Sequence, residues 1–391
     1  MLARGPLLWV GVLGLIWIVL TFAWMYGSID RAKEHAQATY AKYAHMDSIL
    51  DAGNSTLGFE RVFVASMPDR TDKRDMMALS ASLSDIKFQF EDGIDASKVS
   101  NKAIPDSWDR ESGNGTYGCW RVHMNIAQKI AAEQISTALV LEDDADWDVH
   151  LKSQLTEFAR GTRYVLDQES NSTASPYGDG WDILWLGHCG LRNRENIDQR
   201  YYVIRDDPTA VPQSLWSFAR RMPNLTPKAL NGTYNRVIYE PTRGLCTWGY
   251  AISLRGARRL LQDQELEEAL PSDRALNRLC TRVKGAKCLA PYPPLVGTHK
   301  AAGRTGKDSD RVDQSGKVRE VGETGQIIFS VKLNLKQLLG VGKDLVVRSQ
   351  WPDKTMVKAL EGEGGRGLLE IPRGEGVWVR KSEYLDFPRP N

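Results

Sequence analysis

The chain has 391 residues, more than a single hydrophobic core usually holds, so more than one structural unit is expected. Hydrophobic residues make up 42% and charged residues 26% of the sequence, a balance that excludes a wholly disordered chain. Lys and Arg total 51 against 49 for Asp and Glu, and this near-neutral charge argues against a nucleic-acid partner.

The first long apolar segment covers residues 7–26 and carries no charge. Twenty helical residues at about 1.5 Å each match the roughly 30 Å hydrocarbon core of a bilayer. The alternative is a cleaved signal peptide, which would have an apolar region of about 7–15 residues followed by small residues. Bulky Trp24 and Tyr26 stand where cleavage would occur. The sequence therefore predicts a retained membrane anchor, with Arg4 in a cytosolic tail over residues 1–6 and the rest of the chain in the lumen.

Asparagine and cysteine patterns agree with a luminal location. Asn-x-Ser/Thr sequons, each a weak pattern alone, begin at Asn54, Asn114, Asn171, Asn224 and Asn231. The odd count of five cysteines leaves at least one thiol unpaired within the chain. Cys280 and Cys288 are close enough in sequence to bridge a short loop, and Cys189 with Cys246 is a plausible second pair. We therefore expect a single-pass type II protein of the Golgi or endoplasmic reticulum membrane.

The remaining chain divides into a polar stem over residues 27–58, a folded domain over 59–305 and a Gly- and charge-rich appended segment over 306–391. Apolar runs predict strands at 61–66, 87–90, 137–141, 182–186 and 247–253, and periodic patterns predict helices at 72–83, 120–134 and 255–268. This alternation predicts an α/β fold, with a mostly parallel sheet and flanking helices. Ligands of such folds gather at the carboxyl ends of the strands.

An acidic run at residues 142–148 directly follows the predicted strand 137–141 and holds five carboxylates in seven residues. Like charges this close raise one another's pKa values or require a cation. Oxygen ligands suit Mn²⁺ or Mg²⁺, ions typically held by one or two carboxylates together with substrate phosphates. The alternative is a solvated acidic loop, or acids at the start of a helix. The position at a strand end favours a site for a metal and a diphosphate.

Such a site would serve glycosyl transfer, because a sugar nucleotide leaves as a diphosphate whose developing charge a metal neutralises. The acceptor hydroxyl then needs a nearby carboxylate or histidine to take its proton. No covalent intermediate is required if the anomeric centre inverts.

These residues resemble glycosyltransferase family 25, which includes bacterial lipopolysaccharide galactosyltransferases and procollagen galactosyltransferases. The similar blocks lie, in the family's order, at residues 62–70, 115–119 with His123, 139–144, 182–187, 249–253, 271–273 and 293–295. Two departures are Ser66-Met67, where the family usually has Asn-Leu, and Val122, where it has Ser before the histidine. The resemblance implies a GT-A type fold, a nucleotide-sugar donor (most often UDP-galactose), a divalent metal and inversion.

The same resemblance suggests roles for individual residues. Glu142 would face the ribose or uracil of the donor, and Asp144 would bind the metal. Asp146 is a second candidate ligand, since 144–146 is itself an acidic-x-acidic pattern. His299 stands where many GT-A enzymes supply a further metal ligand from the end of the domain, although a surface histidine in a loop is the competing interpretation.

The candidate base is Asp273, with Asp182 and Glu240 as the alternatives. Three cations could neutralise diphosphate oxygens or simply pair with surface acids: Arg70, Arg74 and Lys300. His188 and Trp185 either line an acceptor cleft or pack inside the domain.

The leading hypothesis is a type II membrane glycosyltransferase that moves a hexose from a UDP-sugar to a hydroxyl of a glycan or glycoprotein acceptor. A metal-dependent phosphoesterase is an alternative, but it would need more ligand motifs than six scattered histidines supply. A membrane-tethered carbohydrate-binding protein without turnover is the other alternative, and the intact acidic triplet counts against it. Fold alone does not determine the acceptor.

Overall fold

The computed structural model describes residues 49–169, 173–216, 221–311, 316–340, 346–362 and 369–384. The described residues belong to one compact unit that starts at residue 49. The predicted anchor at 7–26, most of the stem at 27–58 and the sequon at Asn171 lie outside the described residues. Among the residues that are described, none of the helices combines the length and the hydropathy that a bilayer crossing requires.

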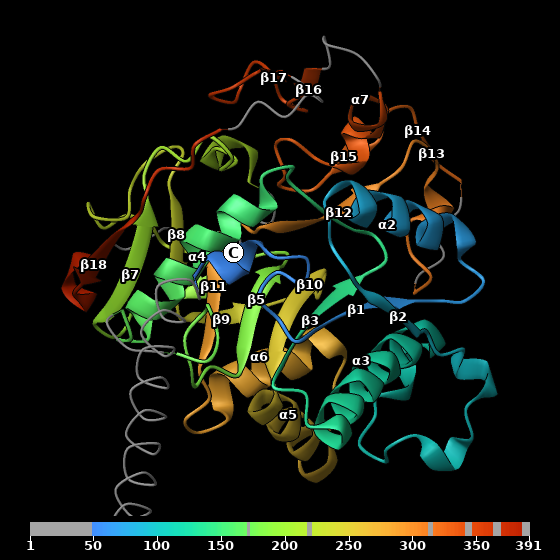
Figure 1. The fold of residues 1–391 in the computed structure, drawn as a ribbon. Coiled ribbons are helices and arrows are strands. Elements are labelled where there is room, and N and C mark those ends of the chain that lie inside the picture. The colour runs from blue at the N-terminus through green and yellow to red at the C-terminus, as the bar shows by residue number, and fades with distance from the viewer. Residues whose placement is uncertain are drawn as a thin grey trace, which may run out of the picture. The chain divides into compact units, whose positions relative to one another are not determined.

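A nine-stranded sheet organises the unit that starts at residue 49, in the order β18-β7-β8-β11-β5-β10-β3-β1-β2 (Figure 1). Its strands are β1 Arg61–Ser66, β2 Gln89–Asp92, β3 Thr137–Glu142, β5 Ile183–Gly187, β7 Gln199–Ile204, β8 Arg236–Tyr239, β10 Gly249–Ser253, β11 Cys288–Tyr292 and β18 Glu375–Val379. β1 pairs in parallel with β2 and β3, and β5 with β11, whereas the other pairings are antiparallel.

The α/β class is confirmed, but the prediction of a mostly parallel sheet is wrong. β10 runs antiparallel between β3 and β5, and the strands β18, β7 and β8 form an antiparallel edge. The sequence could not show this, because an apolar run reads the same whichever way the strand crosses the sheet. A central antiparallel strand covered on both faces has the same composition as a buried parallel one.

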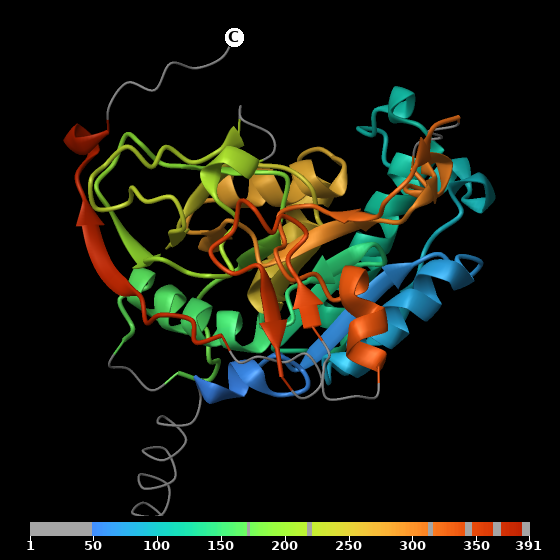
Figure 2. The same ribbon diagram turned by 90° about the horizontal axis from the view of Figure 1, so that it is seen from above.

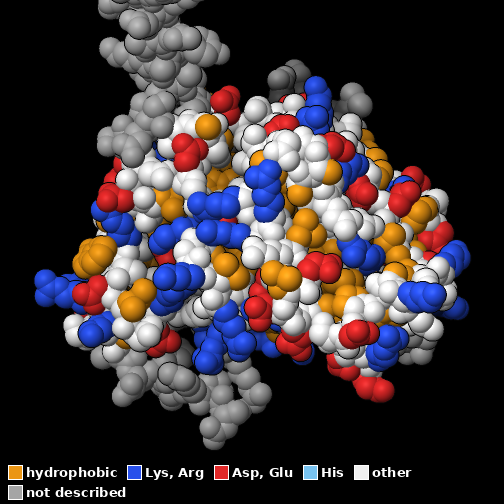
Figure 3. Space-filling model, turned by 90° about the horizontal axis from the view of Figure 1, so that it is seen from below, with side chains coloured by type: hydrophobic (Ala, Val, Ile, Leu, Met, Phe, Trp, Pro, Cys, Tyr) orange, Lys and Arg blue, Asp and Glu red, His pale blue; other side chains and the backbone are white. Residues whose placement is uncertain are grey.

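Helices cover both faces of the sheet (Figure 1). α2 Thr71–Leu83 and α4 Leu151–Val165 pack on one face, and α3 Asn114–Glu133, α5 Leu254–Leu266 and α6 Ser272–Arg282 pack on the other. Alternate strand residues feed the two cores, so that Val140 joins the core with α3 whereas Leu139 and Leu141 join the core with α4. From the outside, the layer containing α5 shows Lys and Arg side chains gathered over part of its surface (Figure 3).

Most predicted elements occur close to their expected positions, including the strand at 61–66 and the helices α2 and α5. α3 differs, because it begins at Asn114 rather than at Trp120. Its first turns contain glycines that a helix pattern alone disfavours. Close packing explains them: a Cβ at Gly118 would collide with the carbonyl oxygen of Ile94, and one at Gly115 would press on the backbone of Arg311.

Smaller elements complete the described parts. They are β4 Ala145–Trp147, β6 Leu191–Asn193, β9 Pro241–Gly244, β12 Val296–Lys300, β13 Gly303–Arg304, β14 Val318–Arg319, β15 Glu323–Thr324, β16 Val346–Arg348, β17 Ala359–Glu361 and α7 Leu335–Leu339. Residues beyond 305, expected to form an appended segment, include β15, which pairs with β12, and β18, which pairs with β7. Figure 2 shows β18 at one edge of the sheet and β2 towards the other.

Both expected disulfides are present. Cys189 pairs with Cys246 and Cys280 with Cys288, leaving Cys119 as the free thiol.

The asparagines of the predicted glycosylation sequons are not all accessible. Asn224 is only 4% exposed and hydrogen-bonds to Glu195, which makes it a poor glycosylation acceptor in the folded protein.

Candidate active site

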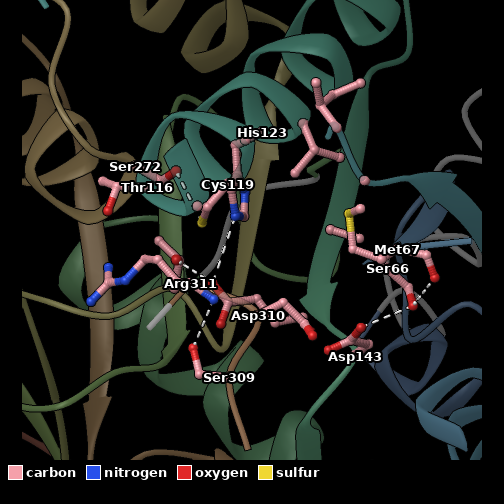
Figure 4. A pocket seen from close by; sticks show the side chains of 18 of the residues that line it. Ser66, Met67, Thr116, Cys119, His123, Asp143, Ser272, Ser309, Asp310 and Arg311 are labelled. Atoms are coloured by element: carbon pink, nitrogen blue, oxygen red, sulfur yellow. Dashed lines mark hydrogen bonds and ion pairs between the residues drawn. The ribbon is translucent and has the colours of Figure 1, made fainter. Parts of the chain in front are cut away.

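A cavity of about 540 Å³ opens where β1 and β3 end and β10 begins. Ser66 ends β1, Glu142 ends β3, and Thr247 precedes β10. The first turns of α3 and α6 line the cavity, as do residues 308–311 (Figure 4). The acidic run begins at the last residue of β3, and its first three residues, 142–144, line this cavity.

Glu142 is held beside the buried imidazole of His123. Its Oε1 lies 3.6 Å from His123 Nε2 and accepts a 2.5 Å hydrogen bond from Thr247 Oγ1. Burial would raise the pKa of the carboxyl, but the contacts with His123 and Thr247 lower it below its usual value. Burial would also lower the pKa of His123, yet Tyr250, Cys119 and Glu142 together raise it well above the ordinary value. The pair therefore favours an ionised Glu142.

Asp143 lies at the centre of a small ion-pair network. Its Oδ1 is 2.9 Å from Lys73 Nζ, and its Oδ2 accepts a 2.9 Å hydrogen bond from Ser66 Oγ. The same Lys73 ammonium lies 3.0 Å from Asp310 Oδ2. Burial opposes the charge of Lys73, but Asp143, Asp144 and Asp310 outweigh it and raise the pKa. A protonated lysine is thus fixed among carboxylates inside the cavity.

Asp144 has one oxygen that lacks any partner. Thr298 Oγ1 donates to its Oδ2 at 3.0 Å, but Oδ1 is buried and makes no hydrogen bond. Burial, and then the charges of Glu142 and Asp143, raise the pKa of this carboxyl to about 7. A buried carboxylate oxygen without a partner, on a residue that lines a cavity, is a donor suited to a hard divalent cation.

Asp273 lies in the first turn of α6 and lines the same cavity. The backbone N–H of Cys246 donates to its Oδ2 at 3.2 Å, and the N–H of Arg274 donates to its Oδ1 at 2.8 Å. The structure therefore brings three of the residues selected from the sequence, Glu142, Asp144 and Asp273, into one cavity.

Asp146 and His299, the other candidate metal ligands, do not line the cavity. Asp146 is fully buried, and its carboxylate accepts hydrogen bonds from Thr324, Ser330 and the backbone of Trp147 and Lys332. His299 Nδ1 lies 3.0 Å from Thr324 Oγ1, and burial lowers the pKa of its ring to about 4. The oxygens of Asp146 are already used inside the fold, where they tie β4 to residues beyond 305.

The alternative bases lie elsewhere. Asp182 precedes β5 at the end of the sheet opposite Glu142, since β3 and β5 both run antiparallel to β10. It is fully buried and accepts hydrogen bonds from Arg255, Arg259 and the N–H of Lys287. Glu240 pairs with Lys287 Nζ at 2.8 Å. Neither carboxylate lines the cavity.

The predicted phosphate-binding cations also lie outside the cavity lining. Arg70 forms ion pairs with Asp72 and Asp310. Arg74 hydrogen-bonds the Ser66 carbonyl at 2.9 Å. Lys300 ends β12, paired across the strands with Glu323. Arg70 and Arg74 each touch a residue that lines the cavity, Arg70 through Asp310 and Arg74 through Ser66.

His188 and Trp185, which were candidates for an acceptor cleft, are packed inside the domain instead. His188 is fully buried, donates from Nε2 to the Pro291 carbonyl at 2.9 Å and accepts at Nδ1 from the N–H of Gly190. Trp185 donates to the Cys246 carbonyl at 2.8 Å. Burial lowers the pKa of His188 to about 4, which suits its role as both donor and acceptor.

Sequence reasoning did not select Lys73, Asp310 or Lys332, which add positive and negative charge around the acidic run. Lys332 is buried and donates to the Asp143 carbonyl at 3.3 Å, although it lies 189 residues further along the chain. Lys73 could have been noticed, because it lies one turn into the helix that follows β1. Asp310 and Lys332 carry no local signal, since only the tertiary fold brings them to the acidic run.

Part of the chain is similar to a known protein family. Residues 59–173 match the family model described as "Glycosyltransferase family 25 (LPS biosynthesis protein)". This match confirms the resemblance for the part of the fold that carries β1, α2, α3 and the acidic run.

Individual relatives are distant and longer than this chain. The human protein named "Inactive glycosyltransferase 25 family member 3" is 27% identical over 236 residues, which cover 57% of this chain and 32% of that protein. "Procollagen galactosyltransferase 1-A" of Xenopus laevis is 25% identical over 232 residues, or 56% of this chain and 31% of that protein. "Procollagen galactosyltransferase 1" of Danio rerio is 25% identical over 244 residues, with shares of 59% and 33%. The matched part is thus about a third of the length of these curated relatives.

Proposed function

The chain carries a glycosyltransferase family 25 domain and is distantly homologous to procollagen galactosyltransferases, and from this premise we propose that it transfers a hexose from a nucleotide sugar to a hydroxyl group. The proposed donor is UDP-galactose, and the proposed acceptor is a glycan or glycoprotein. The observation that carries the proposal is the meeting of Asp144 and Asp273 in one cavity, with one oxygen of Asp144 left without a partner. We further propose a GT-A type fold with inversion at the anomeric carbon.

Asp144 is the residue that would hold Mn²⁺ or Mg²⁺, because its buried Oδ1 lacks a partner. The metal would supply charge neutralisation for the departing diphosphate. Lys73, fixed by Asp143 and Asp310, is a cation of the cavity lining and replaces Arg70, Arg74 and Lys300 as the proposed diphosphate contact. Glu142 keeps its proposed place on the nucleoside side, held ionised by His123.

Asp273 is the proposed general base. Its carboxylate lines the cavity and is held there by hydrogen bonds from the backbone N–H groups of Cys246 and Arg274. The acceptor hydroxyl would lose its proton to Asp273 as the sugar bond forms, and a single displacement then needs no covalent intermediate.

The cellular compartment of the protein is inferred from its disulfides and its relatives. Two disulfides indicate an oxidising compartment, and the procollagen galactosyltransferase homology agrees with the lumen of the secretory pathway. We propose that residues 7–26 anchor the chain in the Golgi or endoplasmic reticulum membrane with type II orientation. Protease protection of the folded domain in sealed microsomes would test this topology.

The enzyme proposal is tested with the purified full-length chain, Mn²⁺ and a panel of sugar nucleotides, measuring release of the nucleoside diphosphate. We expect UDP release from one donor, lost in Asp144→Asn and reduced by about 10²–10⁴-fold in Asp273→Asn, the range for a missing general base. Glu240→Gln is the matched control, because this carboxylate lies outside the cavity. Wild-type turnover in Asp273→Asn would remove it as the base.

A second candidate is a carbohydrate-binding protein of the same family without turnover. It is favoured by the name of the human relative, which describes that protein as inactive. This candidate predicts no diphosphate release from any donor, together with measurable binding of UDP and Mn²⁺ by calorimetry. Hydrolysis of simple phosphate esters would instead support a phosphoesterase.

A further inference from the structure

Cys119 and His123 lie one turn apart on α3 and project from the same side of the helix into the cavity (Figure 4). Glu142 approaches them from the end of β3. One ligand atom from each of the three side chains, a sulfur, a ring nitrogen and a carboxylate oxygen, lies within 4.8 Å of the other two. In the described part of the chain, this is the one group of three such residues that could share a metal ion.

We propose that Cys119, His123 and Glu142 form a second metal site, distinct from Asp144, that takes Zn²⁺. Zinc is bound by sulfur at about 2.3 Å and by nitrogen or oxygen at about 2.0–2.2 Å, so tetrahedral ligand atoms lie roughly 3.5 Å apart. His123 Nε2 and Glu142 Oε1 are 3.6 Å apart. The Cys119 sulfur lies within 4.8 Å of both other ligand atoms.

The histidine is oriented as a ligating histidine usually is. Its Nδ1 lies 3.0 Å from the Tyr250 hydroxyl, a contact that leaves Nε2 facing Glu142. Partners of this kind on the second ring nitrogen fix the tautomer and orientation of metal-bound histidines. Cys119 Sγ lies 3.8 Å from Ser272 Oγ, which positions the thiol at the cavity wall. The fourth position of a tetrahedral ion would face the cavity.

Ligand chemistry separates this site from the one at Asp144. A thiolate and an imidazole suit zinc, whereas carboxylate and hydroxyl oxygens suit manganese or magnesium. The inference does not depend on glycosyl transfer, because it uses only the three ligands and their orienting partners. Zinc bound here would use Glu142 as a ligand. It would therefore occupy the part of the cavity that we assign to the nucleoside of the donor.

The test uses untagged full-length protein handled anaerobically, with its free thiol verified by titration. Zn²⁺ affinity is measured by competition with a chromophoric chelator, and Co²⁺ substitution reports sulfur coordination through a thiolate-to-cobalt charge-transfer band. We expect one tight Zn²⁺ per chain and a sulfur band with Co²⁺. Cys119→Ser and His123→Gln should each weaken Zn²⁺ by at least about 100-fold, and Tyr250→Phe by roughly 10-fold or more, the range for loss of an orienting partner.

Two variants serve as controls. Glu240→Gln changes a carboxylate outside the cavity, and Asp144→Asn removes the proposed manganese ligand, so both should keep wild-type Zn²⁺ affinity. Mn²⁺ binding, followed by electron paramagnetic resonance, should be unchanged in Cys119→Ser. The proposal is overturned if the wild type binds no Zn²⁺, if the cobalt complex lacks the sulfur band, or if Cys119→Ser binds Zn²⁺ normally. Absence of Mn²⁺ binding or of transferase activity would count against the proposed function and leave the zinc site standing.

Discussion

Replacing Asp144 by asparagine should stabilise the metal-free protein while abolishing transferase activity. Burial disfavours the ionised form of this carboxyl, and the negative charges of Glu142 and Asp143 disfavour it further. Its pKa therefore rises from 3.8 to about 7. At about 1.36 kcal/mol per pH unit, this rise corresponds to roughly 4 kcal/mol of free energy lost on folding with the group ionised. Because the residue is half-buried rather than sealed from water, we expect about 2–4 kcal/mol.

The sign of the effect depends on pH. Below pH 3.8 the carboxyl is protonated in both the folded and the unfolded protein, so the variant gains nothing. As pH rises towards about 7, the unfolded chain ionises while the folded protein keeps its proton, and the advantage of Asp144→Asn grows. Above that pH the advantage is constant.

Urea unfolding followed by tryptophan fluorescence measures this difference at pH 8 and pH 4. The variant should unfold at higher urea at pH 8 with an unchanged slope, and the two proteins should nearly coincide at pH 4. Mn²⁺ with UDP should stabilise the wild type more than the variant, because only the wild type keeps the proposed ligand. A variant less stable than the wild type at pH 8, or an advantage that persists at pH 4, would refute the reasoning.

Three further variants test the fold outside the cavity lining. Burial lowers the pKa of His188 to about 4, so the free energy of unfolding of the wild type should fall by up to about 3 kcal/mol as pH falls from 6.5 to 4. His188→Gln should lack this decrease, as measured by urea unfolding at both pH values. Asp182→Asn removes a buried carboxylate that pairs with the partly exposed Arg255 and Arg259, and it should lower the free energy of unfolding by about 1–3 kcal/mol, while calorimetry finds unchanged UDP affinity. The double change of Cys280 and Cys288 to serine opens a crosslink with a sequence separation of 8 and should lower unfolding free energy by roughly 2–3 kcal/mol, measured by thermal unfolding.

Local sequence patterns were sufficient to predict part of the fold and part of the candidate site. The strand over 61–66 and the Cys280–Cys288 pair follow from apolar runs and short spacing, and the structure has both. Glu142 and Asp144 could be selected because an apolar strand leads directly into them. Asp273 came from a family resemblance rather than from a pattern, and it also lines the cavity.

Contacts between remote segments were beyond local signals. Asp144 and Asp146 look alike in the sequence, yet Thr324 and Ser330 use the oxygens of Asp146, whereas Asp144 keeps one oxygen free. Those two hydroxyl groups lie more than 170 residues along the chain, where no pattern marks them as partners of an acid. The antiparallel direction of β10 was hidden for a similar reason, because composition does not encode direction.

The pairing of β18 with β7 limits how the chain can be shortened for biochemical work. A fragment ending near residue 305 would expose the N–H and C=O groups along the outer side of β7, and an unpaired apolar edge of that kind promotes aggregation. The same cut would deprive Lys73 of Asp310 and leave Asp146 buried without Thr324 and Ser330. Poor solubility of such a fragment would therefore follow from the loss of β18 and of these buried partners, and would not mean that residues 59–305 fold poorly in the full-length chain.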